Sequence, residues 1–267
     1  MVQHSLHFPT GALGQSVEHL WVVRGSLASP LRQMLLPDGA VTLMVNLGEP
    51  QRLCDRADVS RGTLYRRSWV SGQQPGPIVI QHAGRCHLAG IRFRPGGAAA
   101  LFRFPVTELT GQVIELEDIW REEGQRLREE LAGAADDADT FRILRCWLES
   151  RLSGPDRRVS FAAAMLQRGG TGVGRLAAEM GFSHRHLVQI FSHQVGLNPK
   201  LFGRVHRLQR VIQKIGLRRS IDWAEEADAA GYFDQPHLVR DFRELAGLTP
   251  TEFLARRGPY AGYLNVA

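Results

Sequence analysis

The sequence predicts an α+β protein with a β-rich N-terminal domain followed by an all-helical C-terminal domain. Three observations support this. Residues 1–95 alternate short apolar segments with turn signals, a helical module occurs twice after residue 155, and the whole net charge falls in that second half. A chain of 267 residues has room for two domains that each bury a core. The helix stop Ser153-Gly154-Pro155-Asp156 places the domains at residues 1–154 and 155–267.

The N-terminal part has the pattern of a small antiparallel barrel or sandwich. Apolar residues at 41, 43, 45 and 47 have the period of a half-buried strand. Further short strands are expected at 69–70, 78–80 and 88–93, with glycine- and proline-rich turns between them. Pro95-Gly96-Gly97 ends the sheet, and residues 119–152 are helical with a break at 133–139. We therefore expect a barrel-like or cupin-like domain with a helical extension.

Several features of this domain have two interpretations. Phe141, Leu144, Leu148 and Leu152 form one helical stripe, which is either core or the seam of a homodimer. Arg92 and Arg94 share a strand face that either binds an anionic effector or is solvated. His82 and His87 lack the His-x-His and following Glu of a cupin metal site, so we expect no metal.

Cysteine use and hydropathy place the chain in the cytoplasm. Cys54, Cys86 and Cys146 have no metal-ligand spacing, so we expect reduced, buried and inert thiols. The first residues lack a basic segment leading into an apolar run, and no stretch has the length of a membrane span.

A helical module occurs twice in the C-terminal half, with the copies 51 residues apart. The matched residues are His186-Leu187-Val188 with His237-Leu238-Val239, Phe191 with Phe242, Gly196-Leu197 with Gly247-Leu248, Pro199 with Pro250, and Phe202 with Phe253. Upstream the offset is 50, so the second copy has one extra residue in its turn. A helix, a glycine turn, a polar cap and an apolar-spaced helix, found twice on a basic half-chain, predict two DNA-binding helix-turn-helix units.

The second helix of each unit is expected to bind DNA through its polar face. Ser183 and Asp234 are good N-caps for these helices, and Leu187, Phe191, Leu238 and Phe242 belong to their buried faces. Arg and Gln on the opposite faces suit paired hydrogen bonds to guanine and adenine in the major groove. The candidate DNA-binding residues are Ser183, His184, Arg185, Val188, Gln189, Ser192, Asp234, Gln235, Val239, Arg240 and Arg243.

The charge differs between the two units. Residues 155–219 hold 12 basic and 2 acidic residues, a net charge of +10, whereas residues 220–267 hold 4 and 8, a net charge of −4. We therefore expect the first unit to supply most of the electrostatic attraction to DNA. Residues 199–216 are predicted to form one connecting helix, about 25 Å long, which could set the two reading helices roughly one DNA turn apart. Its Arg204, Arg207, Arg210 and Lys214 form a basic flank.

Residues 157–257 resemble the AraC/XylS family of bacterial transcription regulators. The resemblance rests on the run Gly-Phe-Ser…His-Leu…Phe…Gly-Leu-x-Pro-x-x-Phe from Gly181 to Phe202, and on its counterpart from Ala230 to Phe253. It implies a seven-helix DNA-binding domain and promoter sites made of asymmetric half-sites. Val188 and Val239 stand where the family often has a polar base-reading residue, so we expect them to contact only a thymine methyl. Pro236, in the first turn of its helix, is tolerated but cannot donate a hydrogen bond.

The segment Gly-Ile-Arg-Phe-Arg-Pro-Gly-Gly, from Gly90 to Gly97, resembles a regulator subgroup whose front domain senses a ligand or dimerises. We interpret the chain as an effector-responsive, sequence-specific transcription regulator of the bacterial cytoplasm and nucleoid, without enzyme activity, cofactor or metal. Its expected partners are double-stranded promoter DNA, a small-molecule effector, RNA polymerase and a second copy, and not a membrane. The alternatives are a cupin-like small-molecule binder or enzyme with a degenerate DNA-binding head, and an architectural DNA binder that is indifferent to sequence.

Overall fold

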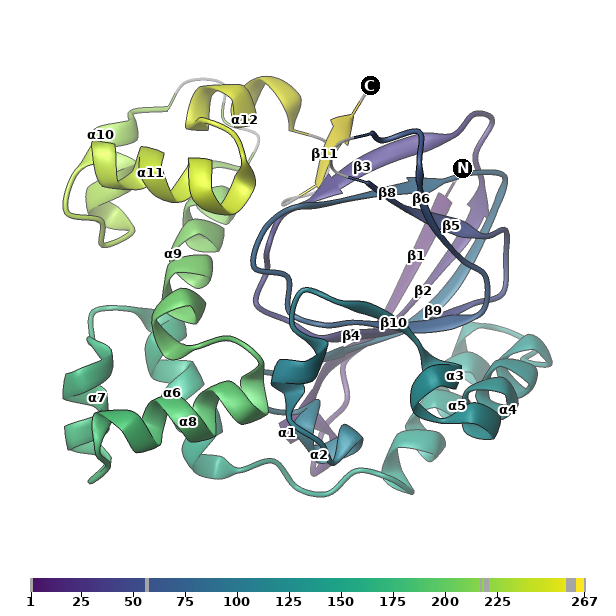
Figure 1. Cartoon of the computed structure of the whole chain (residues 1–267). Helices are drawn as coiled ribbons and strands as arrows, with labels where there is room; N and C mark the ends of the chain where they lie inside the picture. The colour runs from purple at the N-terminus through teal and green to yellow at the C-terminus, as the bar shows by residue number, and fades with distance from the viewer. Residues whose placement is uncertain (1, 56–57, 217, 219–220, 258–262, 267) are drawn as a thin grey trace.

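The computed structural model describes residues 2–55, 58–216, 218, 221–257 and 263–266. Met1 and Ala267, the outer limits of the two predicted domains, lie outside the described residues. Strands make up most of the N-terminal part and helices most of the C-terminal part, which confirms the predicted α+β class (Figure 1). Among the described residues, no helix has the length and apolar content needed to cross a membrane.

Among the described residues, the strands of the N-terminal part and one strand from residues 263–266 form two antiparallel sheets. In order, the first sheet contains β1 (Val2–His7), β2 (Val17–Ser26), β9 (Arg85–Phe93), β4 (Thr42–Asn46), β7 (Ser68–Ser71) and β10 (Val113–Glu115). The second contains β11 (Tyr263–Val266), β3 (Leu31–Leu35), β8 (Ile78–His82), β5 (Gln51–Cys54) and β6 (Gly62–Tyr65). In a closed barrel every strand is hydrogen-bonded to a neighbour on both sides, so that no edge strand is left. Over the described ranges no strand pairs from one sheet to the other, so of the two predicted arrangements the closed barrel is excluded and two open antiparallel sheets are present.

The outer face of the first sheet is covered by the helical extension. The extension consists of α2 (Ala99–Phe102), η1 (Val106–Leu109), α3 (Leu116–Ile119), α4 (Arg121–Ala132) and α5 (Asp137–Glu149), while α1 (Leu13–Ser16) precedes β2. Leu20, Leu43 and Ile91 of the sheet and Leu144 and Leu148 of α5 are all 0% exposed and share one core.

The stripe predicted on the helix at 141–152 is therefore internal. Leu144 and Leu148 are fully buried, and Phe141 and Leu152 pack against the same core. The dimer-seam interpretation of this stripe is wrong, because the sheet of the same chain already covers it. The surface of α5 that faces solvent carries Arg142, Arg145, Cys146 and Glu149 instead.

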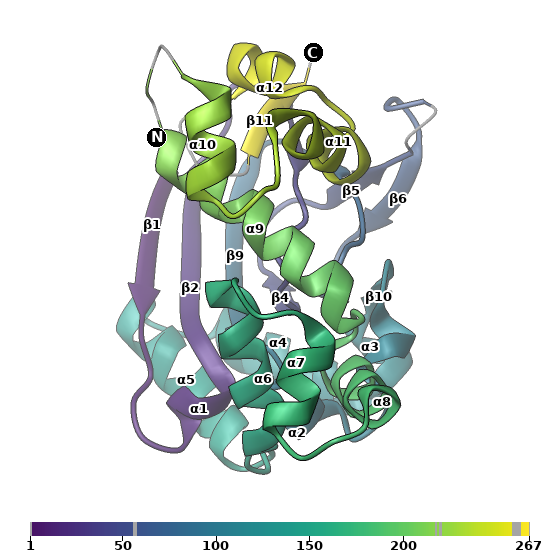
Figure 2. The same ribbon diagram turned by 90° about the vertical axis from the view of Figure 1, so that its left-hand side faces the viewer.

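The described residues of the C-terminal part form seven helices: α6 (Arg157–Arg168), α7 (Val173–Glu179), α8 (His184–Val195), α9 (Pro199–Ile215), α10 (Trp223–Ala229), α11 (Gln235–Ala246) and α12 (Pro250–Arg256). Figure 2 shows α9 running between two groups, with α6 to α8 at one end and α10 to α12 at the other. A second core joins both groups along α9, and Phe191, Phe202 and Phe242 are its largest fully buried side chains.

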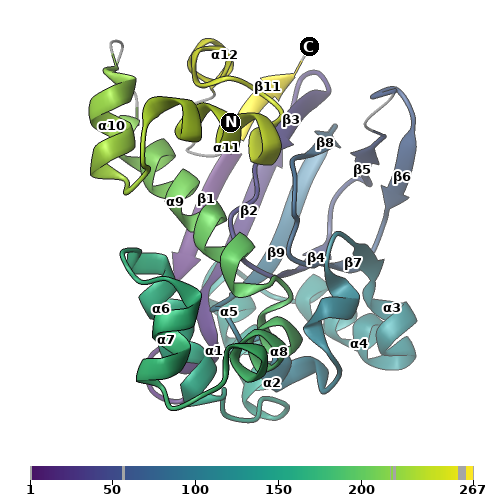
Figure 3. The same cartoon turned by 60° about the vertical axis from the view of Figure 1, so that its left-hand side comes forward.

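The described end of the chain returns to the N-terminal part. Strand β11 pairs with β3 at the edge of the second sheet, with Leu264 opposite Met34 (Figure 3). Leu264 is 1% exposed and lies in the same core as Leu36 and the C-terminal helices. The two parts therefore share buried apolar side chains, so experiments on DNA binding are best done with the full chain.

Candidate nucleic-acid interface

The first reading helix, α8, begins and faces solvent as its sequence predicts. Gly181 ends the preceding turn with a φ of 69°, a left-handed conformation that glycine adopts without strain. The Ser183 hydroxyl then accepts a hydrogen bond from the backbone N–H of His186 at 3.1 Å, which caps the helix. Leu187 and Phe191 are 0% exposed, so the opposite face of α8 is left to solvent.

The candidate side chains of α8 lie together on that face. His184, Arg185 and Gln189 are exposed, and Val188 and Ser192 are half-buried beside them. An open hollow of about 470 Å³ is lined by His184, Arg185, Val188 and Gln189. These side chains offer hydrogen-bond donors and acceptors around a valine methyl surface, which is the chemistry that a base edge in the major groove requires.

The second reading helix, α11, repeats this arrangement. The Asp234 carboxylate caps it by accepting from the N–H of His237 at 2.7 Å. Gln235, Arg240 and Arg243 are exposed, and Val239 is half-buried. Leu238 and Phe242 are 0% exposed. In both helices, therefore, the predicted caps and the predicted faces are where the sequence placed them, and Pro236 occupies the first turn of α11.

His186 and His237, which occupy the same position in the two copies, each pack against an aromatic ring of the preceding turn. His186 packs edge-on against Phe182 with ring centroids 4.9 Å apart, and His237 packs against Tyr232 in the same way at 5.2 Å. Tyr232 is followed by Phe233, the extra residue of the second turn, whose side chain is 94% exposed.

The predicted basic flank of α9 does not face solvent as a free surface. Arg204 is paired with Asp241 and Glu244 of α11. Arg207 donates to the carbonyl of Gly231 at 3.1 Å, and Arg210 donates to those of Gln167 and Ala230. Lys214 pairs with Glu226 of α10 at 2.9 Å. Arg204, Arg207 and Lys214 bind the protein's own second unit, and Arg210 joins that unit to α6, so groups of the same chain occupy this flank.

The partners of Arg204 and Lys214 are two buried carboxylates, Asp241 and Glu226, which were not predicted from the sequence. Asp241 is 2% exposed and Glu226 is 1% exposed. Burial alone would raise the pKa of Glu226, but hydrogen bonds from Lys214 and Arg218 outweigh it and hold that pKa below its usual value. A signal for Asp241 exists in the sequence, because it lies three residues after Leu238 and directly before Phe242, among core positions of α11.

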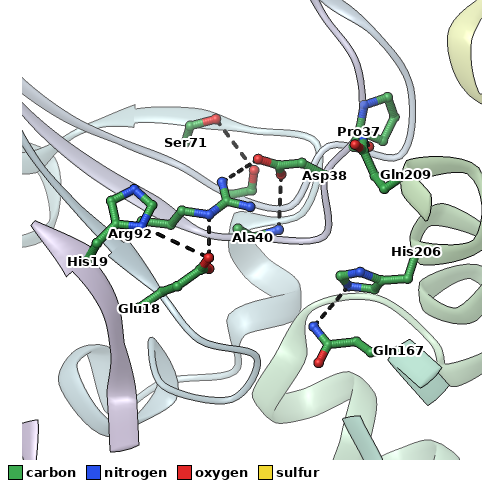
Figure 4. A network of polar contacts seen from close by, with 11 residues as sticks. Glu18, His19, Pro37, Asp38, Ala40, Ser71, Arg92, Gln167, His206 and Gln209 are labelled. Carbon is green, nitrogen blue, oxygen red and sulfur yellow. Dashed lines mark hydrogen bonds and ion pairs between the residues drawn. The ribbon is translucent and has the colours of Figure 1, made fainter. Parts of the chain in front are cut away.

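Arg92 and Arg94 have partners of their own. Arg92 lies between Glu18 and Asp38 and pairs with both (Figure 4). Burial acts to lower its pKa, but Asp38 and Glu18 raise it further than burial lowers it, so Arg92 stays charged. Arg94 is exposed and donates to the carbonyl of Gly14 at 2.8 Å. Arg92 is thus neither a solvated strand residue nor a cation free for an anion.

The turn that holds Asp38 contacts α9 directly. The Gln209 side chain donates to the carbonyl of Pro37 at 2.6 Å in a buried hydrogen bond (Figure 4). A Cβ atom on Gly39 would lie 2.5 Å from Nε2 of His206, so the turn and α9 are in close contact. A further link joins η1 to the end of α8, where the Thr110 hydroxyl donates to the carbonyl of Gly196 at 2.7 Å.

The remaining histidine and cysteine candidates show no shared site. In the part of the chain that the structure describes, no group of three His, Cys, Asp or Glu side chains could hold a metal ion. Burial lowers the pKa of His82 to about 4 and also lowers that of His87. Cys54 and Cys86 are buried, as predicted, and burial raises both thiol pKa values. Cys146 is exposed, so the prediction of a buried thiol is wrong there.

Comparisons with known proteins divide the chain in the same way. A family model described as a helix-turn-helix domain matches residues 156–256, and a domain of unknown function matches residues 6–115. ToxT from Vibrio cholerae is 7% identical, with 95% of this chain and 98% of that chain covered and a TM-score of 0.46. An AraC-type regulator from Chromobacterium violaceum is 26% identical over 37% of this chain and 86% of its own, with a TM-score of 0.31.

A regulator of the AraC family from Rhodopseudomonas palustris is 24% identical over 37% of this chain and 92% of its own, with a TM-score of 0.31. No curated protein matches the chain. The helix-turn-helix match covers both copies of the doubled module, and the structure folds each copy as two helices joined by a glycine turn. Residues 156–256 are therefore a helix-turn-helix domain, and the chain is a DNA-binding transcription regulator with a further domain at its N-terminus.

Proposed function

We propose that α8 and α11 read bases in two successive major grooves of promoter DNA. The observation that carries this proposal is the matched pair of capped helices, each with a buried apolar face and an exposed face of Arg and Gln. Helix α9, with 17 residues, is about 25 Å long and connects the two units. A spacer of that length suits reading helices placed one DNA turn apart, roughly 34 Å.

We assign roles to the exposed residues from their chemistry. In α8, Arg185 and Gln189 make paired hydrogen bonds to guanine and adenine edges, and Val188 contacts a thymine methyl. Ser183, His184 and Ser192 flank them at the groove edge. In α11, Gln235 and Arg240 read bases and Val239 contacts a methyl group, while Arg243 binds a phosphate. Asp234 acts through its cap, because its carboxylate is directed at the backbone of its own helix.

The first test is base preference. Arg185→Ala and Gln189→Ala should each weaken binding by about 1–3 kcal/mol and relax preference at a few adjacent base pairs, because each removes a base-edge contact. Arg240→Ala should relax preference about one helical turn away, with a smaller loss of affinity. The measurement is binding of each variant to a library of single-base changes in one natural site. The proposal fails if Arg185→Ala and Arg240→Ala alter preference at the same base pairs or at none.

The second test is the salt dependence of binding by the full chain. Log affinity should fall linearly with log salt, by roughly 0.9 for each phosphate neutralised. Arg243→Ala should reduce the slope by about one phosphate and weaken all sequences alike. Lys214→Met should leave the slope unchanged, because Lys214 already pairs with Glu226. Equal slopes for the wild type and Arg243→Ala, or a reduced slope for Lys214→Met, would contradict this division of the basic residues.

We infer that the N-terminal part, with its boundary at residues 154/155, senses a signal and passes it to α9. The hydrogen bond from Gln209 to Pro37 and the contact of His206 with Gly39 support this, because they join the sheets to the helix that carries both reading units. We propose a small-molecule effector as the signal, RNA polymerase and a second copy of the chain as partners on DNA, and no catalytic step. The bacterial nucleoid is then the place of action. The pH dependence of the unfolding free energy of His206→Gln tests the contact itself.

A further inference from the structure

The basic flank of α9, formed by Arg204, Arg207, Arg210 and Lys214, holds the second helix-turn-helix unit. Its four side chains recur at intervals of three or four residues and so lie along one side of the helix. Arg207 and Arg210 hold the carbonyls of Gly231 and Ala230, where α10 ends, and Lys214 holds Glu226 within α10. Arg204 is different, because it holds the reading helix α11 itself.

The contact between Arg204 and α11 is directional. Nε and Nη2 of Arg204 donate to Oδ1 of Asp241 at 3.0 and 2.7 Å, and Nη2 also contacts Glu244. The Asp241 side chain is 2% exposed and that of Arg204 is 24% exposed, so water competes little for the pair. A planar guanidinium that makes two charged hydrogen bonds fixes an angle as well as a distance, which apolar packing does less strictly.

The other reading helix is fixed to the same part of α9 by aromatic packing. Phe202, two residues before Arg204, contacts Phe191 of α8 with ring centroids 5.2 Å apart. Both rings are 0% exposed. One short segment of α9 therefore holds α8 through Phe202 and α11 through Arg204.

We propose that Arg204 and Asp241 are positioning residues that set the number of base pairs between the two DNA boxes. This inference rests on the proposed function, in which α8 and α11 read successive grooves. A buried ion pair adds little net stability but can impose a unique arrangement on the elements that it joins. Here the arrangement is that of one reading helix relative to the other, and neither residue contacts DNA.

The experiment compares sites that differ only in box spacing. Full-length protein is titrated against duplexes with the two boxes at the natural spacing, one base pair closer, and one or two base pairs further apart, and against a duplex with the second box scrambled. The variants are Asp241→Asn, which keeps a hydrogen bond to Arg204, Arg204→Lys, which keeps the charge without the fork, and the double variant Arg204→Met/Asp241→Ala. The matched control is Arg126→Met/Glu122→Ala, which removes an exposed pair on α4.

We expect the wild type, the control and Asp241→Asn to prefer the natural spacing by at least about fivefold for each base pair shifted, the loss typical of one mismatched base pair. The double variant should lose most of that preference while binding the scrambled duplex as the wild type does. The spacing preference of Arg204→Lys should lie between those of the wild type and the double variant. Arg204→Lys replaces the double variant as the test if the double variant does not melt cooperatively. The inference is overturned if the folded double variant keeps the wild-type preference for the natural spacing. If the double variant does not fold, the same result for Arg204→Lys overturns it. The proposed function itself is tested by the wild type. If it is wrong, the wild type binds the duplex with the scrambled second box as tightly as the complete site, and box spacing has no effect to measure.

Discussion

Replacing Arg204 with methionine is expected to lower the free energy of unfolding by about 3–5 kcal/mol, because it leaves a buried carboxylate without its partner. Asp241 is 2% exposed, and Nε and Nη2 of Arg204 both donate to its Oδ1. Urea unfolding of the full chain at pH 7, followed by circular dichroism, measures the change.

Removing the second charge should reverse most of this loss. Adding Asp241→Ala to Arg204→Met takes the unpaired carboxylate away, so the double variant should be more stable than Arg204→Met alone. The comparison variant is Arg126→Met, whose exposed partner Glu122 can return to water, and little change is expected there. A loss under about 1 kcal/mol for Arg204→Met would show that Asp241 reaches water or another donor.

Stability is expected to fall as the pH is lowered from 6.5 to 4, and His206 should account for up to about 3 kcal/mol of that fall. Burial lowers the pKa of His206 from 6.5 to about 4, while Asp38 acts in the opposite direction. The unfolded chain therefore takes up a proton near pH 6.5, and the folded chain resists it until about pH 4. The contribution is zero above pH 6.5, grows below it, and is complete at pH 4.

The measurement is the free energy of unfolding of the wild type and His206→Gln between pH 7.5 and 4. Glutamine is neutral and keeps a polar group near Gln167, which lies 3.5 Å from Nε2 of His206. The variant should lose less stability on acidification, so the two curves should converge or cross. Parallel curves would mean that water reaches His206 and that the turn at Gly39 is not packed on α9. His82, whose pKa burial also lowers to about 4, adds equally to both proteins.

The helices could be predicted from the sequence because their signals are local. Ser183, Asp234 and the apolar spacing after each define α8 and α11 within a dozen residues. The strands were harder to predict. Strand β2 packs on both faces, with Leu20 and Val22 in one core and Trp21 and Val23 in another, so its apolar residues do not alternate. Strand β1 is an edge strand with Leu6 56% exposed, and it has little apolar pattern to detect.

The exposed faces of the candidate site followed from helical periodicity, but the role of the basic flank did not. Counting charges along a sequence cannot tell a free cation from one with a distant partner. Arg204 and Asp241 are 37 residues apart, and the hydrogen bond from Gln209 to Pro37 spans 172 residues. The pairing of β11 with β3, in which β11 becomes the edge strand of the second sheet, is equally non-local. These contacts form only when the two parts of the chain pack together, so no window of sequence contains them.

Selection of binding sites from a random duplex library by the full-length protein tests the central claim most directly. Two reading helices on one rigid connector should enrich two different boxes with a fixed centre-to-centre separation of about one helical turn, 10–10.5 base pairs. Arg185→Ala should relax base preference within one box and Arg240→Ala within the other. Enrichment of a single box, or of no sequence at all, would contradict the account.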